Sequence, residues 1–195
     1  LLALLLPGCL RLQQVIEISK ENKGRFKLEV SLPKEVVDAF VAKGDVRAAT
    51  FFDPIKGAAY FAETDGFRIT NYRVFDHKEE DGSTRKYIQV EGEMTDVRKA
   101  LASGKLGRFE YVPKQDGPSR ISLAFDLPRA AGKPQKLREA ASGLKLYLKL
   151  DVPGKITETT AGKKQHGRSW ASWTFNADAD PSFLQTPPKI SVTYK

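Results

Sequence analysis

The sequence predicts an α+β protein, with short helices packed on one face of an antiparallel β-sheet and a repeated β-β-α order. The main observation is a period-2 alternation, in which apolar residues take every second position. Residues 144–150 place Leu at each even position and Lys or Tyr at each odd one, and residues 26–32 and 121–127 alternate in the same way. Strands with one apolar and one polar face are typical of antiparallel sheets.

Turn and helix signals divide the alternating segments. The pair Asp81-Gly82 separates residues 68–77 from 84–94 and indicates a hairpin. Apolar residues at helical spacing over 33–41 predict a helix that ends before Gly44. The predicted order is β-β-α over residues 10–43, 67–104 and 107–143, with helices at 33–41, 95–101 and 134–142, followed by strands at 144–152, 169–176 and 190–194.

The start of the chain carries a lipid-attachment signal. Residues 1–6 are almost purely aliphatic and too short to span a bilayer. The run Leu6-Pro7-Gly8-Cys9 resembles the lipobox of bacterial lipoproteins. This resemblance implies that residues 1–8 are the tail of a signal peptide and that the sulfur of Cys9, the only cysteine, carries diacylglycerol. Residues 9–195 are then one domain, exported and anchored in the cell envelope. Because Leu10 rather than Asp follows the cysteine, the expected location in a Gram-negative cell is the outer membrane.

Positive charge is concentrated in one part of the chain. The formal net charge is +8, and residues 98–138 hold 10 Lys or Arg against 3 Asp or Glu. This asymmetry favours an anionic partner such as anionic lipid, glycolipid or cell-wall polymer, and an ordinary solvated basic surface is the alternative. Nucleic acid is not expected as a partner of an exported protein. The candidate contacts to an anionic surface are Arg98, Lys99, Lys105, Arg108, Arg129, Lys133, Lys136 and Arg138.

Aromatic residues suggest a second kind of contact. The segment 50–67 is the most aromatic, and Asp53-Pro54 with Gly57 predicts that its backbone is irregular. It is either a loop that enters lipid or lines an apolar pocket, or part of the ordinary core. Trp173 and Trp170 lie on opposite faces of a predicted strand, so the first should be core and the second partly exposed. The candidate apolar contacts are Phe51, Phe52, Tyr60, Phe61 and Trp170.

Catalytic signals are absent from the sequence. His77 and His166 stand in no recognisable motif, and both are expected to be exposed. No nucleophile elbow, zinc-binding HExxH or phosphate-binding loop occurs. We therefore expect no catalytic residue, no metal site and no cofactor.

A family resemblance rests on the two ends of the domain. Gly8-Cys9-Leu10-Arg11 leads directly into a strand, and residues 152–159 lead through a polar loop to Trp173-Thr174-Phe175. In these features the sequence resembles the LppM-type bacterial lipoproteins. That resemblance implies no catalytic residues. The expected function is a non-enzymatic, membrane-anchored envelope lipoprotein that binds an anionic or amphiphilic ligand. The alternative is a structural or assembly factor that docks another envelope protein, for example by a sheet edge.

Overall fold

The structure, a computed structural model, describes residues 10–62, 66–124 and 134–195. Its strands are β1 (Arg11–Ile18), β2 (Gly24–Pro33), β3 (Phe67–Lys78), β4 (Thr84–Met94), β5 (Arg108–Val112), β6 (Ser119–Ala124), β7 (Lys145–Asp151), β8 (Ile156–Thr159), β9 (Trp170–Asn176) and β10 (Lys189–Tyr194). The helices are α1 (Lys34–Ala42), α2 (Val46–Phe51), α3 (Pro54–Ala62), α4 (Val97–Ala102) and α5 (Pro134–Ala140), with a 3-10 turn η2 at Pro181–Leu184.

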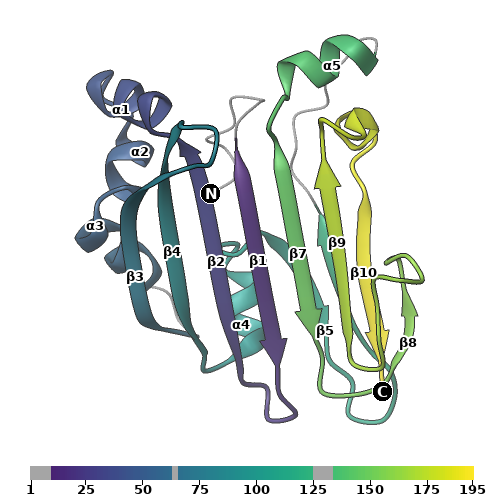
Figure 1. The fold of residues 1–195 in the computed structure, drawn as a ribbon. Coiled ribbons are helices and arrows are strands. Elements are labelled where there is room, and N and C mark those ends of the chain that lie inside the picture. Colours follow the sequence, from purple (N-terminus) through teal and green to yellow (C-terminus); the bar gives the residue numbers. More distant parts are fainter. Residues whose placement is uncertain (1–9, 63–65, 125–133) are drawn as a thin grey trace.

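Two sheets and short helices confirm the predicted α+β class (Figure 1). The six-stranded sheet has the order β3-β4-β2-β1-β7-β9, and the four-stranded sheet has the order β5-β6-β10-β8. The strand pairs β1–β2, β3–β4 and β5–β6 are antiparallel and each is followed by a helix, as the predicted repeat requires. One pairing differs from the prediction of an antiparallel sheet, because β1 and β7, the fourth and fifth strands of the larger sheet, are parallel neighbours.

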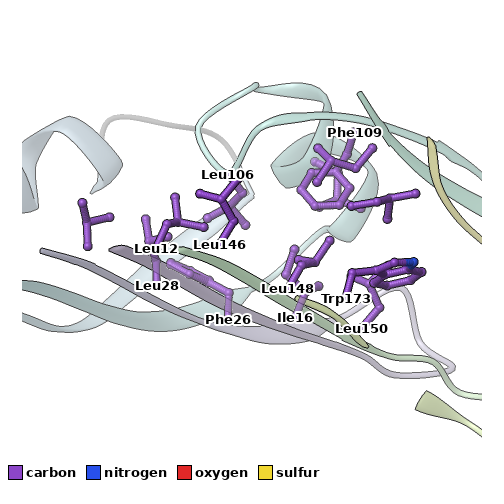
Figure 2. Packing of buried hydrophobic residues seen from close by; sticks show 14 of the residues in the cluster. Leu12, Ile16, Phe26, Leu28, Leu106, Phe109, Leu146, Leu148, Leu150 and Trp173 are labelled. Atoms are coloured by element: carbon purple, nitrogen blue, oxygen red, sulfur yellow. The ribbon is translucent and has the colours of Figure 1, made fainter. Parts of the chain in front are cut away.

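The alternating apolar residues form the core on the inner face of the six-stranded sheet. Ile16 of β1, Phe26 of β2 and Leu148 of β7 are at most 3% exposed. Figure 2 shows them facing Leu106 and Phe109, which belong to the α4–β5 layer. Burial of such side chains contributes about 1.5–3 kcal/mol each. The predicted burial of Trp173 is confirmed, since 4% of this residue is exposed.

Helices α2 and α3 correct the expectation of an irregular backbone over residues 50–67. The Asp53-Pro54 pair is a helix start, because Asp53 Oδ1 accepts the N–H groups of Ile55 and Lys56 at 2.9 and 3.0 Å and Pro54 is the first helical residue. Phe61 of α3 is completely buried against the sheet, with its ring centroid 6.4 Å from that of Phe26. The aromatic residues thus anchor the helices to the sheet.

The outer face of the six-stranded sheet is polar, and many of its charges are paired. Lys27 and Glu91 are cross-strand neighbours whose Nζ and Oε1 atoms lie 3.0 Å apart. Arg11 Nη1 donates to Glu79 Oε2 at 2.6 Å, and the hydroxyl of Tyr87 donates to Glu79 Oε1 at 2.7 Å. Pairs of opposite charge on neighbouring strands stabilise the exposed face of a sheet.

The strand directions give the sheets two distinct ends. The "Leu10 end" is defined by Leu10, Pro33 and Lys145, where β1 begins, β2 ends and β7 begins. The "far end" is defined by the β1–β2 turn at residues 19–23 and the β7–β8 turn at residues 152–155. Figure 1 shows the β1–β2 turn and the carboxyl end of β10 together at the far end. Among the described helices, none is both long and apolar enough to cross a membrane.

Candidate anion-binding cleft

A cleft of about 1100 Å³ opens at the far end, where strand ends of both sheets meet. Its lining comes from the β1–β2 turn, the start of α4, the β5–β6 loop, the β7–β8 turn, the residues before β9 and the end of β10. Six of the lining residues are exposed cations: Lys20, Arg98, Lys114, Lys155, Arg168 and Lys195.

These six cations have no carboxylate partner within the described part of the chain. The two acidic residues that line the cleft, Glu21 and Asp96, contact other groups than these six side chains. Glu21 Oε2 lies 3.5 Å from Lys23 Nζ. Asp96 Oδ1 accepts the N–H of Lys99 at 3.0 Å, and this bond holds the pKa of the Asp96 carboxyl below its usual value. The cleft therefore holds six cations against two carboxylates, an excess of positive charge, in contrast to the paired charges of the outer sheet face.

One wall of the cleft is fixed by contacts between the β1–β2 turn and α4. Asn22 adopts a left-handed conformation with φ of 57°, which Asn tolerates better than most residues. Its carbonyl accepts the N–H of Val97 at 2.9 Å, and its side-chain amide donates to Asp96 Oδ1 at 3.1 Å. These bonds hold Lys20 of the turn and Arg98 of the helix on the same wall.

The opposite wall is fixed by backbone pairing at the start of β8. Lys155 and Lys195 exchange two bonds, of 2.7 Å from Lys155 N–H and 3.0 Å from Lys195 N–H. The N–H of Ile156 donates to the carbonyl of Arg168 at 2.7 Å. Gly154 is required here, because a Cβ at this position would lie 1.9 Å from the Lys195 carbonyl oxygen. The cationic side chains of this wall therefore extend from a backbone that hydrogen bonds hold in place.

Two tyrosine hydroxyls add neutral hydrogen-bonding groups to the cleft. The Oη atoms of Tyr111 and Tyr194 lie 3.3 Å apart. Burial of the Tyr194 ring raises the pKa of its hydroxyl, and the Tyr111 bond raises it further, so this hydroxyl stays protonated at neutral pH. One hydroxyl donates to the other, which leaves one O–H to donate to a ligand oxygen.

The basic residues that the sequence suggested as contacts to an anionic surface lie in several different parts of the structure. Arg98 lines the cleft, and Lys99 lies beside it in α4. Lys105 Nζ lies 3.0 Å from the centroid of the Tyr60 ring, a cation–π contact. Arg108 begins β5, and exposed Lys136 and Arg138 lie on α5, which precedes β7 at the Leu10 end. Arg129 and Lys133 lie outside the described residues.

The candidate apolar contacts are mostly part of the core. Phe51 and Phe61 are buried, so neither presents a surface to lipid. Phe52 and Tyr60 are half-buried and pack against the core. Trp170 is half-buried, as the alternation predicts, and its indole packs on Gly167, where a Cβ would lie 2.4 Å from Trp170 Nε1.

Neither histidine joins a site. His77 is exposed beside the Tyr87 ring, and His166 is half-buried, which is less exposed than expected. Within residues 10–62, 66–124 and 134–195, no group of three or more potential metal ligands is found. The lipobox residues Leu6, Pro7, Gly8 and Cys9 lie outside the described residues.

Of the six cleft cations, Arg98 is the only candidate contact named from the sequence. Lys114 lies in the basic segment 98–138 but was not among the candidate contacts, and the remaining four were not singled out from the sequence: Lys20, Lys155, Arg168 and Lys195. They are scattered along the chain, and only the fold brings them together. A signal was present, since Pro113-Lys114, Gly154-Lys155 and Gly167-Arg168 each place a cation beside a turn residue at a strand end. Following the predicted strand directions would have put these turns at one end of the sheets.

Comparison with known proteins supports the fold. The chain matches the NMR structure of the folded domain of the LppM protein of Mycobacterium tuberculosis with a TM-score of 0.50 and 11% sequence identity, over 98% of this chain and 92% of that one. The fold is similar to that of LppM. This finding agrees with the resemblance to LppM-type lipoproteins at the level of fold, which is as far as 11% identity extends. No protein-family model and no curated protein matches the sequence.

Proposed function

We propose that this protein is a non-enzymatic envelope lipoprotein, anchored through Cys9, that binds an anionic ligand in the far-end cleft. The observation that carries the proposal is the set of six exposed cations without carboxylate partners around one cleft. The LppM-like fold and the lipobox support the envelope setting.

The charge arrangement favours a ligand with several anionic groups. An exposed ion pair contributes only about 0.2–1 kcal/mol, so a single anion would bind weakly. A ligand that engages three or four of the cations gains several such contributions at once. The pinned walls reduce the conformational entropy that binding would otherwise cost.

The cleft is suited to a polar group rather than to an acyl chain. Besides the cations, its lining includes Ser19, Asn22, Gln115 and Ser119, and the two tyrosines contribute their hydroxyls. An amphiphile would place its head group here. A polymer of phosphorylated or carboxylated sugars would fit the same chemistry.

A titration with inorganic tripolyphosphate tests the ligand class. The protein carrying Cys9→Ser is compared with Lys155→Glu/Arg168→Glu and with a matched control, Lys43→Glu/Lys78→Glu, which makes the same charge change at two exposed residues outside the cleft. We expect the cleft variant to lose at least about tenfold in affinity, since 1.4 kcal/mol is a factor of ten. The control should change it by about twofold or less. An equal loss in both variants, or no binding by the parent protein, would refute the proposal.

The anchor is tested separately by intact mass. Full-length protein expressed in a bacterium should carry the added mass of diacylglycerol, and the Cys9→Ser variant should not. A mature wild-type protein without that mass would refute the anchoring part of the proposal and leave the cleft untouched.

A structural or assembly function is the alternative. The feature that favours it is β3, a strand of 12 residues at the edge of the larger sheet. Such an edge offers unpaired backbone groups to a partner strand. Crosslinking in cells from a photoreactive residue at exposed Arg73 of β3 should capture one stoichiometric protein partner if this alternative holds.

A further inference from the structure

We infer that the cleft takes its anion from outside the bilayer that anchors the protein. The inference rests on the proposed function and adds the source of the ligand. It follows from the position of strand β1, which has the proposed anchor at one end and the cleft at the other.

Strand β1 separates the anchoring end from the cleft. Leu10 precedes its first residue, and Ser19 and Lys20, which line the cleft, follow its last one. Eight residues at about 3.3 Å each place the cleft roughly 25 Å from Leu10. The cleft is thus at the end of the six-stranded sheet opposite the lipid attachment point.

The connection between the folded body and the lipid is short. Leu10 is 5% exposed, and its carbonyl accepts the N–H of Lys145 at 2.9 Å, so Leu10 is already part of the sheet. Only Cys9 lies between it and the lipid, and one extended residue reaches about 3.3–3.6 Å. A lipid on Cys9 therefore brings the Leu10 end to the head groups.

Dissolved salt weakens the electrostatic attraction between the cleft cations and the anchoring bilayer. The Debye length is about 8 Å at physiological ionic strength, so roughly 25 Å is about three Debye lengths. Head groups around the anchor attract the cleft cations only weakly over that distance. Exposed cations near that surface include Lys145, at the start of β7, and Lys136 and Arg138 of α5.

The ligand is therefore a polyanion that reaches the cleft from the opposite side. Phosphate or carboxylate groups on a soluble polymer and phosphate head groups of a facing membrane share this chemistry. In either case the protein would connect its own membrane to a separate anionic partner.

The single cysteine allows a direct test that needs no cellular lipidation. The protein with a free Cys9 thiol is coupled to a maleimide lipid in vesicles of phosphatidylcholine alone, or of phosphatidylcholine and phosphatidylglycerol in equal parts. Each preparation is titrated with inorganic tripolyphosphate at physiological ionic strength. We expect the same affinity, within about twofold, on the neutral and the anionic vesicles.

A tenfold weaker affinity on the anionic vesicles would mean that their own head groups occupy the cleft, and would overturn the inference. The uncoupled protein carrying Cys9→Ser serves as reference. If it fails to bind tripolyphosphate, the proposed function fails, which is distinguishable from the first outcome. The coupled Lys155→Glu/Arg168→Glu variant should lose binding in both preparations, whereas Lys43→Glu/Lys78→Glu should retain it.

A second arm identifies the source of the anion. Protein coupled to neutral vesicles is mixed with fluorescent phosphatidylglycerol vesicles. Capture that is lost in the cleft variant would identify head groups of a facing membrane. Binding of tripolyphosphate without vesicle capture would identify a soluble polyanion. Both results support a ligand outside the anchoring bilayer.

Discussion

Glu79 joins two strands of the outer sheet face through hydrogen bonds. Its carboxylate accepts one bond from Tyr87 and one from Arg11, and these partners hold the pKa of the carboxyl below its usual value. In the unfolded chain the pKa returns to about 4.3. The stabilisation is therefore complete above that pH and is lost as the pH falls through the lower pKa of the folded state.

Glu79→Gln should remove this pH-dependent stabilisation. We expect the free energy of unfolding to fall by about 1–2 kcal/mol near pH 7, and by much less at an acidic pH low enough to protonate the wild-type carboxyl in the folded state. Urea unfolding at the two pH values measures the difference. The control is Glu80→Gln, because Glu80 is exposed and has no ion pair to another described residue. A loss that is equal at both pH values would contradict the electrostatic explanation.

Gly154 affects both the stability of the fold and the geometry of the cleft. Ala at this position would place Cβ 1.9 Å from the Lys195 carbonyl oxygen. We expect Gly154→Ala to cost about 1–3 kcal/mol, since the backbone must shift, and to weaken tripolyphosphate binding by displacing Lys155 and Lys195. Gly162→Ala is the control, because its nearest contact is the flexible Gln165 side chain at 3.2 Å. Unchanged stability and affinity in Gly154→Ala would show that this backbone is adaptable.

At the scale of elements, helix α3 depends on one aromatic residue. Phe61 is completely buried, whereas Ile55 of the same helix is 83% exposed. Phe61→Ala should cost about 3–5 kcal/mol through lost burial and the cavity left behind. Ile55→Ala should change the free energy of unfolding by less than about 0.5 kcal/mol. Chemical unfolding of the two variants checks this, and equal losses would mean that α3 does not dock through Phe61.

Most elements were predictable from residue patterns, and the errors have physical causes. The alternation identified the strands that contain Leu28, Leu123 and Leu148, since each must bury one face. Residues 54–62 were not predicted as a helix, because Asp53-Pro54 suits a turn as well as a helix start. The parallel pairing of β1 with β7 was missed because alternation states which face is buried and not which strand is the neighbour.

At the scale of the whole molecule, the cleft concentrates charges that repel one another in the unliganded protein. Neutralising two of them with Lys155→Gln/Arg168→Gln should raise the free energy of unfolding by about 0.5 kcal/mol at low ionic strength. The gain should vanish near 1 M salt, where the Debye length is about 3 Å. Thermal unfolding at the two salt concentrations measures it. A lower stability at low salt would indicate that these side chains serve the fold.

The candidate site was less predictable than the fold because it is a property of the assembled chain. The sequence shows an excess of positive charge between residues 98 and 138. Only the Arg98 and Lys114 cations of that segment line the cleft. The other four come from the β1–β2 turn, the β7–β8 turn, the residues before β9 and the end of β10. Counting charges along the chain does not reveal which charged residues the fold brings together at the far end.

The position of β1 has a mechanical consequence for a tethered protein. One of its ends is at the Leu10 end, next to the proposed lipid anchor, and the other is at the cleft, and it is bonded on both flanks, to β2 and to β7. Tension between a membrane and a held polymer would run along the axis of this strand. The hydrogen bonds on both flanks would then be loaded in shear and share the force, rather than open one after another. A body built in this way transmits a pull from one end to the other without unravelling.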